Sequence, residues 1–138
     1  MTATLIFGEN QLRIDSIRHY AEDAAAGNPY NTFFRLSVRS GDFAGSGPFT
    51  CDIADFRRFA GEIAGLYRFC RECAELADTE YGSVLSLRMS RTGRLTVSGT
   101  VIGSAAEHTL TFTFTADQTA LPPFCAALDG LARASDKL

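Results

Sequence analysis

The sequence contains no tryptophan, a single lysine (Lys137) and only two histidines. Any catalytic group built on histidine would therefore have to use His19 or His108, and no G-x-S-x-G nucleophile elbow occurs. No apolar stretch approaches the roughly 18–20 residues of a membrane span. The N-terminus also lacks the basic and apolar segments of a signal peptide. We therefore predict a cytoplasmic, non-catalytic protein with no membrane partner.

Cysteine is scarce as well, with four residues at positions 51, 70, 73 and 125. Cys70 and Cys73 form a C-x-x-C pair, which we place near the end of a helix, where the helix dipole raises a thiol pKa. A structural zinc site needs two further ligands, and Cys51 and Cys125 lie in segments that resemble core. We predict no cofactor and no metal; Cys70 and Cys73 are the residues that could hold a metal if one bound.

Positive charge is limited too, since the formal net charge is −3 and the sequence pI is about 5.3. Nucleic-acid binding requires a basic surface that neutralises phosphates, so the composition argues against direct nucleic-acid binding. The chain of 138 residues fits a single domain covering residues 1–138.

What the sequence does contain is a self-match at an offset of 65 residues without a gap. Each copy has the pattern of a strand, a capping Asp and an amphipathic helix with apolar residues at spacings of three and four. The first copy comprises Phe49, Thr50, Asp52, Phe56, Phe59, Ile63, Gly65 and Leu66. The second comprises Phe114, Thr115, Asp117, Leu121, Phe124, Leu128, Gly130 and Leu131. One structural unit is therefore predicted to occur twice.

Alternation of apolar and polar residues predicts the strands, most clearly over residues 34–39 and 109–116. Residues 21–31 are predicted to form a loop, because they contain the breaker sequence Gly27-Asn28-Pro29. The predicted order is ββββ-α-βββ-α. This order indicates an α+β fold, with a mainly antiparallel sheet of about six to seven strands and two helices packed on one face.

Acidic residues gather between the first long helix and the next strand. They are Glu72, Glu75, Asp78 and Glu80, followed by Tyr81. Negative charge near a helix C-terminus is locally unfavourable, so these residues suggest a role outside the fold, namely docking of a basic partner. A solvated acidic loop is the alternative interpretation.

Three short segments resemble a known family of small bacterial proteins, the WapI-type immunity proteins and related uncharacterised families. The segments are Phe112–Thr119 (F-x-F-x-x-D-Q-T), Asp55–Phe59 (D-F-x-x-F) and the strand entry Gly82–Leu87. The resemblance implies a non-catalytic cytoplasmic binder that neutralises the toxin domain of a bacterial toxin. Such toxins are commonly nucleases with basic clefts, which an acidic inhibitor can block.

Two other functions fit the sequence. A small-molecule-binding or enzymatic domain would use a Phe-lined pocket between sheet and helices. A homodimeric structural module would pair through the threonine face at 109, 111, 113 and 115, or through an edge strand. The predicted partner-binding residues of the preferred interpretation are Glu72, Glu75, Asp78, Glu80 and Tyr81.

Overall fold

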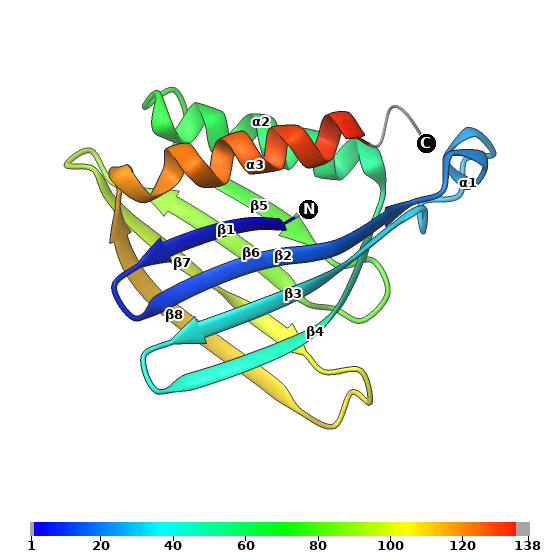
Figure 1. The fold of residues 1–138 in the computed structure, drawn as a ribbon, viewed down its shortest axis with the longest axis horizontal. Helices are drawn as coiled ribbons and strands as arrows, with labels where there is room; N and C mark the ends of the chain where they lie inside the picture. The colour runs from blue at the N-terminus through cyan, green and yellow to red at the C-terminus, as the bar shows by residue number, and fades with distance from the viewer. Residues whose placement is uncertain (1, 135–138) are drawn as a thin grey trace.

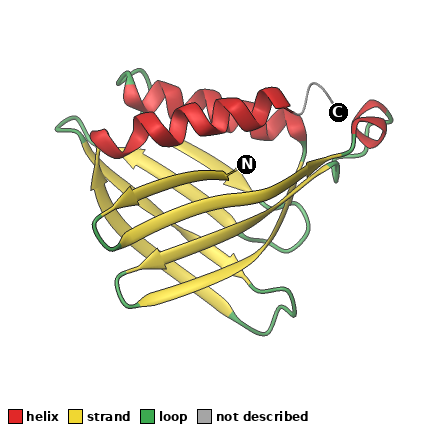
Figure 2. Cartoon of the chain, viewed as in Figure 1, coloured by secondary structure: helices red, strands yellow, loops and turns green. Residues whose placement is uncertain are grey.

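The computed structural model describes residues 2–134 and contains eight strands, three α-helices and one short 3-10 helix (Figures 1 and 2). The strands are β1 (Thr2–Phe7), β2 (Asn10–His19), β3 (Thr32–Ser40), β4 (Phe43–Cys51), β5 (Cys73–Ala77), β6 (Val84–Met89), β7 (Arg94–Ile102) and β8 (Thr109–Asp117). The helices are α1 (Ala21–Ala25), α2 (Ile53–Tyr67), η1 (Gln118–Ala120) and α3 (Leu121–Ala134).

The strands form two antiparallel sheets of four strands each, in the orders β1-β2-β3-β4 and β5-β6-β7-β8. The α+β class is confirmed. The prediction of a single sheet with six to seven strands and two helices is wrong in detail. Local alternation of residues identifies strands but does not specify which strands pair, and pairing is what divides eight strands into two sheets.

Strand β5 is the element that the prediction missed. It has five residues, and the C-x-x-C pair was placed near the end of the preceding helix. Helix α2 instead ends at Tyr67, and Phe69 adopts a left-handed φ of 58° that turns the chain away. Cys70 therefore lies in a loop, and Cys73 begins β5. The predicted loop over residues 21–31 likewise contains the five-residue helix α1.

The two sheets approach each other closely along β4. A Cβ atom on Gly47 would lie 2.1 Å from the carbonyl oxygen of Ile102, and one on Gly45 would lie 3.1 Å from Leu110. Ser40, at the end of β3, donates a 3.3 Å hydrogen bond to the carbonyl of Thr113 in β8. Glycine is required at position 47 because any side chain there would force the sheets apart.

Each long helix covers the sheet that it does not follow. Helix α2 comes after the first sheet and packs on β5 of the second, whereas α3 comes after the second sheet and packs on β1 of the first. The helices also pack on each other, above the strands in Figure 1. Edge strands expose unpaired backbone groups that invite aggregation. This exchange of helices covers the edge strands β1 and β5.

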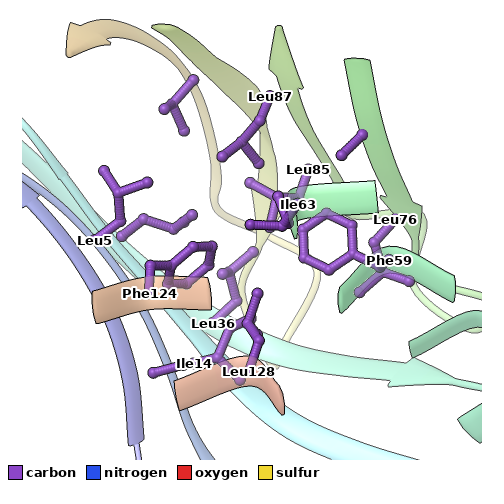
Figure 3. Packing of buried hydrophobic residues seen from close by; sticks show 14 of the residues in the cluster. Leu5, Ile14, Leu36, Phe59, Ile63, Leu76, Leu85, Leu87, Phe124 and Leu128 are labelled. Carbon is purple, nitrogen blue, oxygen red and sulfur yellow. The ribbon is translucent and has the colours of Figure 1, made fainter. Parts of the chain in front are cut away.

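Both sheets and both helices share one apolar core (Figure 3). Phe59 of α2 and Phe124 of α3 are fully buried, and they occupy equivalent positions of the repeat. The repeat also determines how each helix starts. Asp52 accepts a 3.0 Å hydrogen bond from the backbone N–H of Ala54, and Asp117 accepts one of 2.9 Å from Thr119. In both copies, therefore, the capping Asp accepts a hydrogen bond from the backbone N–H of the residue two positions later.

Candidate partner-binding surface

The predicted acidic residues do not form one patch. Glu72 precedes β5, Glu75 projects from it, and Glu80 and Tyr81 follow it in the loop to β6. Strand β5 has five residues, and a strand rises about 3.3 Å per residue, so its two ends lie roughly 15 Å apart. A small contact with a partner would therefore include either Glu72 or the pair Glu80 and Tyr81, but not both.

Asp78 has a structural position. Its side chain is 7% exposed, and Oδ1 accepts hydrogen bonds from the backbone N–H groups of Thr50, Glu80 and Tyr81 at 3.2, 2.9 and 3.2 Å. The backbone N–H of Asp78 donates to the carbonyl of Ser83. Asp78 therefore joins β4 to the β5–β6 loop and shapes the loop that presents its neighbours. Replacing Asp78 would therefore change the stability of the fold, so any effect on partner binding would be indirect.

Glu80 and Tyr81 line a surface hollow of about 450 Å³ between the β5–β6 loop and the outer face of the first sheet. Arg18, Phe33 and Arg35 line the same hollow. Glu80 accepts a 2.9 Å hydrogen bond from the Thr50 hydroxyl, which fixes its carboxylate at the rim. The hollow thus brings two of the five predicted residues, Glu80 and Tyr81, together with two arginines and three phenylalanines.

A β-bulge in β2 creates the arginine side of this hollow. Asp15 pairs with Arg35 and Arg18 pairs with Phe33, so β2 uses one residue more than β3 between these pairs. Ser16 lies in the bulge and has a φ of 57°. Adding one residue moves every later side chain to the opposite face of a strand. The bulge therefore turns Arg18 outward, onto the same face as Arg35.

The aromatic residues around the hollow are partly exposed. The ring of Phe33 meets Tyr20 edge-on at a centroid distance of 5.7 Å, and Tyr20 is 45% exposed. Tyr81 is 38% exposed. The carboxylate of Glu80 raises the pKa of Tyr81. A neutral phenol can donate a hydrogen bond. Tyrosine and arginine are the residue types enriched at the energetic centres of protein interfaces.

Arg18 was not among the predicted site residues, and Arg35 lies at a polar, outward-facing position of the strand predicted over residues 34–39. The alternation over residues 34–39 already indicated the direction of Arg35. No comparable signal exists for Arg18, because the bulge that reorients it follows from pairing with β3 rather than from a local pattern.

The histidines and cysteines, which are the candidates for catalysis or metal binding, do not form a common site in the described part of the chain. His19 hydrogen-bonds the hydroxyl of Thr32 at 3.1 Å, and His108 is exposed. Cys70 is exposed, and its thiol lies 3.7 Å from the carbonyl of Arg68. Burial, followed by the charges of Asp55, Asp52 and Asp78, raises the pKa of Cys51 to about 12, which makes it a poor nucleophile. Among residues 2–134, no three His, Cys, Asp or Glu side chains are grouped for a metal ion.

The sequence matches the immunity protein WapI-like family over residues 5–134, which is nearly the whole chain. The chain belongs to this family. The suspected resemblance is therefore confirmed, and it extends well beyond the three short segments. A comparison with curated proteins finds no match. Within the described residues, no helix is long and apolar enough to cross a membrane.

The chain is similar to solved structures at low sequence identity. WHY1 from Arabidopsis thaliana aligns with a TM-score of 0.50 and 12% identity, over 96% of this chain and 82% of that chain. A chain from crystal structures of MRP1/MRP2 from Trypanosoma bruciei aligns with a TM-score of 0.46 and 12% identity, over 98% and 81% of the two chains. At such identity the likeness to WHY1 concerns the fold alone.

Proposed function

We propose that this member of the WapI-like family is a non-catalytic immunity protein that neutralises a bacterial toxin domain in the cytoplasm by binding it directly. The observation that carries the proposal is the family match over residues 5–134. Direct binding requires an exposed surface with anchor residues, and the hollow beside the bulge in β2 offers arginine and tyrosine side chains.

We place the centre of the interface at Glu80 and Tyr81, with Arg18 and Arg35 beside them. Glu75 would lie at its periphery along β5, and Glu72 would lie outside it. Asp78 would contribute indirectly, by holding the loop that carries Glu80 and Tyr81. The mixture of charges fits a partner surface that presents both a basic and an acidic group, rather than a purely basic cleft.

The experiment is co-expression with the toxin domain encoded beside this gene, followed by a binding measurement with the purified proteins. We expect wild-type protein to restore growth and to bind in a salt-sensitive manner. Tyr81→Ala should weaken binding by roughly tenfold or more, as truncation of an aromatic anchor does. Tyr67→Ala is the matched control, because Tyr67 is 47% exposed and lies at the C-terminal end of α2.

A second pair of variants separates the two ends of the predicted acidic set. Glu80→Lys should weaken binding, whereas Glu72→Lys should leave it unchanged. Equal losses for both variants would show that overall charge, and not this hollow, determines affinity. Absence of both binding and growth rescue would reject the immunity function for this toxin domain.

The phenylalanines that a ligand pocket would need are packed against one another. Phe34 stacks on Phe49 at a centroid distance of 4.7 Å and meets Phe56 edge-on at 5.9 Å. All three rings are at most 4% exposed. This packing favours a protein binder over a Phe-lined pocket. Pairing of two copies through the threonine face stays an alternative, which the dependence of molecular mass on concentration would test.

A further inference from the structure

A second hollow, remote from Tyr81, gathers positive charge on a protein whose net charge is −3. Its volume is about 730 Å³, and it lies between the α2–β5 loop and the β6–β7 hairpin. Its polar lining comprises Arg71, Arg88, Arg91, Arg94, Ser90 and Thr96. Glu72 is the only carboxylate in the lining. Binding sites for small molecules commonly have volumes of about 300–1,000 Å³.

Three of these arginines lack a counter-ion within the part of the chain that the structure describes. Among residues 2–134, no carboxylate lies within ion-pair distance of Arg88, Arg91 or Arg94. Asp117, which pairs with Arg94 across the strands, uses its carboxylate oxygen Oδ1 to cap η1. Like charges held close together repel one another. An anion in the hollow would relieve that repulsion and accept several charge-assisted hydrogen bonds.

The walls of the hollow are fixed to each other. The backbone N–H of Met89 donates a 2.8 Å hydrogen bond to the carbonyl of Glu72, which joins the hairpin to the α2–β5 loop. Arg71 is held by Glu62 at 3.1 Å and by the carbonyl of Cys73 at 3.3 Å. The backbone walls of the hollow and the guanidinium of Arg71 are therefore in place before a ligand arrives, which reduces the entropy lost on binding.

The exposed ring of Phe69 completes the rim. It is 51% exposed and is held by the left-handed turn that ends α2. We propose that this hollow is a binding site for a small molecule that carries two or more adjacent phosphate groups. Guanidinium groups match phosphate oxygens in bidentate geometry, and the hydroxyls of Ser90 and Thr96 add neutral donors. The site is independent of the toxin-binding surface, so either proposal can fail without the other.

The test is calorimetric titration of the full chain with tripolyphosphate, beside orthophosphate and a hexa-aspartate peptide. We expect one tripolyphosphate per chain, bound more tightly than either other probe. The double variant Arg88→Ala/Arg94→Ala should weaken this binding by at least roughly tenfold, the effect of losing one or more charge-assisted hydrogen bonds. Arg88→Lys/Arg94→Lys keeps the charge and should recover part of the affinity.

The control is Arg13→Ala/Arg39→Ala, which removes the same charge from exposed positions on the first sheet. This variant should bind tripolyphosphate like the wild type. An equal loss in the control would reject the site in favour of general electrostatic attraction. Tighter binding of hexa-aspartate than of tripolyphosphate, lost in the Arg88→Ala/Arg94→Ala variant, would show that the hollow accepts an acidic protein segment instead. A normal melting temperature of both double variants establishes that they are folded.

Discussion

The first and second halves of the chain build sheets of the same order and the same helix start, but their outer faces differ. On the first sheet, arginines are spread over the outer face at Arg13, Arg18, Arg35 and Arg39. On the second, Thr96, Ser98 and Thr100 pair with Thr115, Thr113 and Thr111, and arginines gather only at the β6–β7 hairpin end. The shared fold therefore fixes the inward-facing residues of both sheets, whereas the outward-facing residues differ between them.

The inner positions repeat because both halves contribute to one core, whereas the outer positions are free to diverge. Changing the size of a residue that packs against the helices destabilises the protein. Changing an outward-facing residue of a sheet has little effect on stability, so the two outer faces can acquire different binding properties. The first half adds a bulge and the second adds a hairpin lined with arginine.

Truncation of the equivalent core rings is expected to have the largest effect. Phe59 and Phe124 are both fully buried, one in each copy of the repeat. Phe59→Ala and Phe124→Ala should each lower the free energy of unfolding by about 3–5 kcal/mol. Urea denaturation followed by circular dichroism measures this. A loss confined to one variant would show that the two helices do not contribute equally to the core.

Asp78 has no equivalent in the first half, where the short β1–β2 turn replaces the β5–β6 loop. Asp78→Ala would leave one buried and two part-buried backbone N–H groups without their acceptor, and we expect a loss of about 3 kcal/mol. Glu80 is an exposed neighbour of Asp78. Glu80→Gln keeps the shape of this side chain and should change the free energy of unfolding by less than about 0.5 kcal/mol. Thermal denaturation compares the two, and similar melting temperatures would contradict the role assigned to Asp78.

The helix caps should respond alike. Asp52→Ala and Asp117→Ala each remove one acceptor from the first turn, at about 1 kcal/mol. Asp117 also accepts a hydrogen bond from the Thr119 hydroxyl, so we expect the loss for Asp117→Ala to be slightly larger. Asp52→Asn and Asp117→Asn are the controls, because asparagine caps nearly as well. Chemical denaturation of all four variants measures the equivalence.

The smallest effects concern Gly65 and Gly130, which are 65 residues apart in α2 and α3. A Cβ at Gly130 meets no atom within 4 Å, so Gly130→Ala should stabilise the protein by about 0.5–1 kcal/mol. A Cβ at Gly65 would lie 3.0 Å from the side chain of Arg71, which must then move. Gly65→Ala should therefore give a smaller gain. Equal gains in melting temperature would show that the side chain of Arg71 can move aside without destabilising the protein.

Several features could be predicted because their cause lies within a few residues. Asp52 and Asp117 were predicted as caps, and each accepts a hydrogen bond from a backbone N–H two residues later. The apolar spacing of α2 and α3 was visible in the sequence. Strand β5 was not, because five residues beginning at Cys73 carry too little alternation to distinguish them from the helix and loop before them.

The five residues predicted to bind a partner lie in different places, and their role in binding stays a prediction. Glu80 and Tyr81 lie in the hollow, but Glu72 lies at the other end of β5 and Asp78 is buried. Acidic residues that are close in sequence therefore serve different purposes, and the sequence does not distinguish a solvated carboxylate from one that accepts three backbone hydrogen bonds.

The sequence by itself determined the α+β class and the repeated strand, cap and helix, because capping and periodicity act over one or two turns of chain. The family followed from the resemblance of three short segments, and the match over residues 5–134 confirms it. Tertiary structure alone decided that the strands divide into two sheets, that each helix covers the other sheet, and that Arg18 faces outward beside Arg35. These features depend on pairing and packing between distant segments, where the energy of a contact is determined by the partner and not by the neighbouring residues.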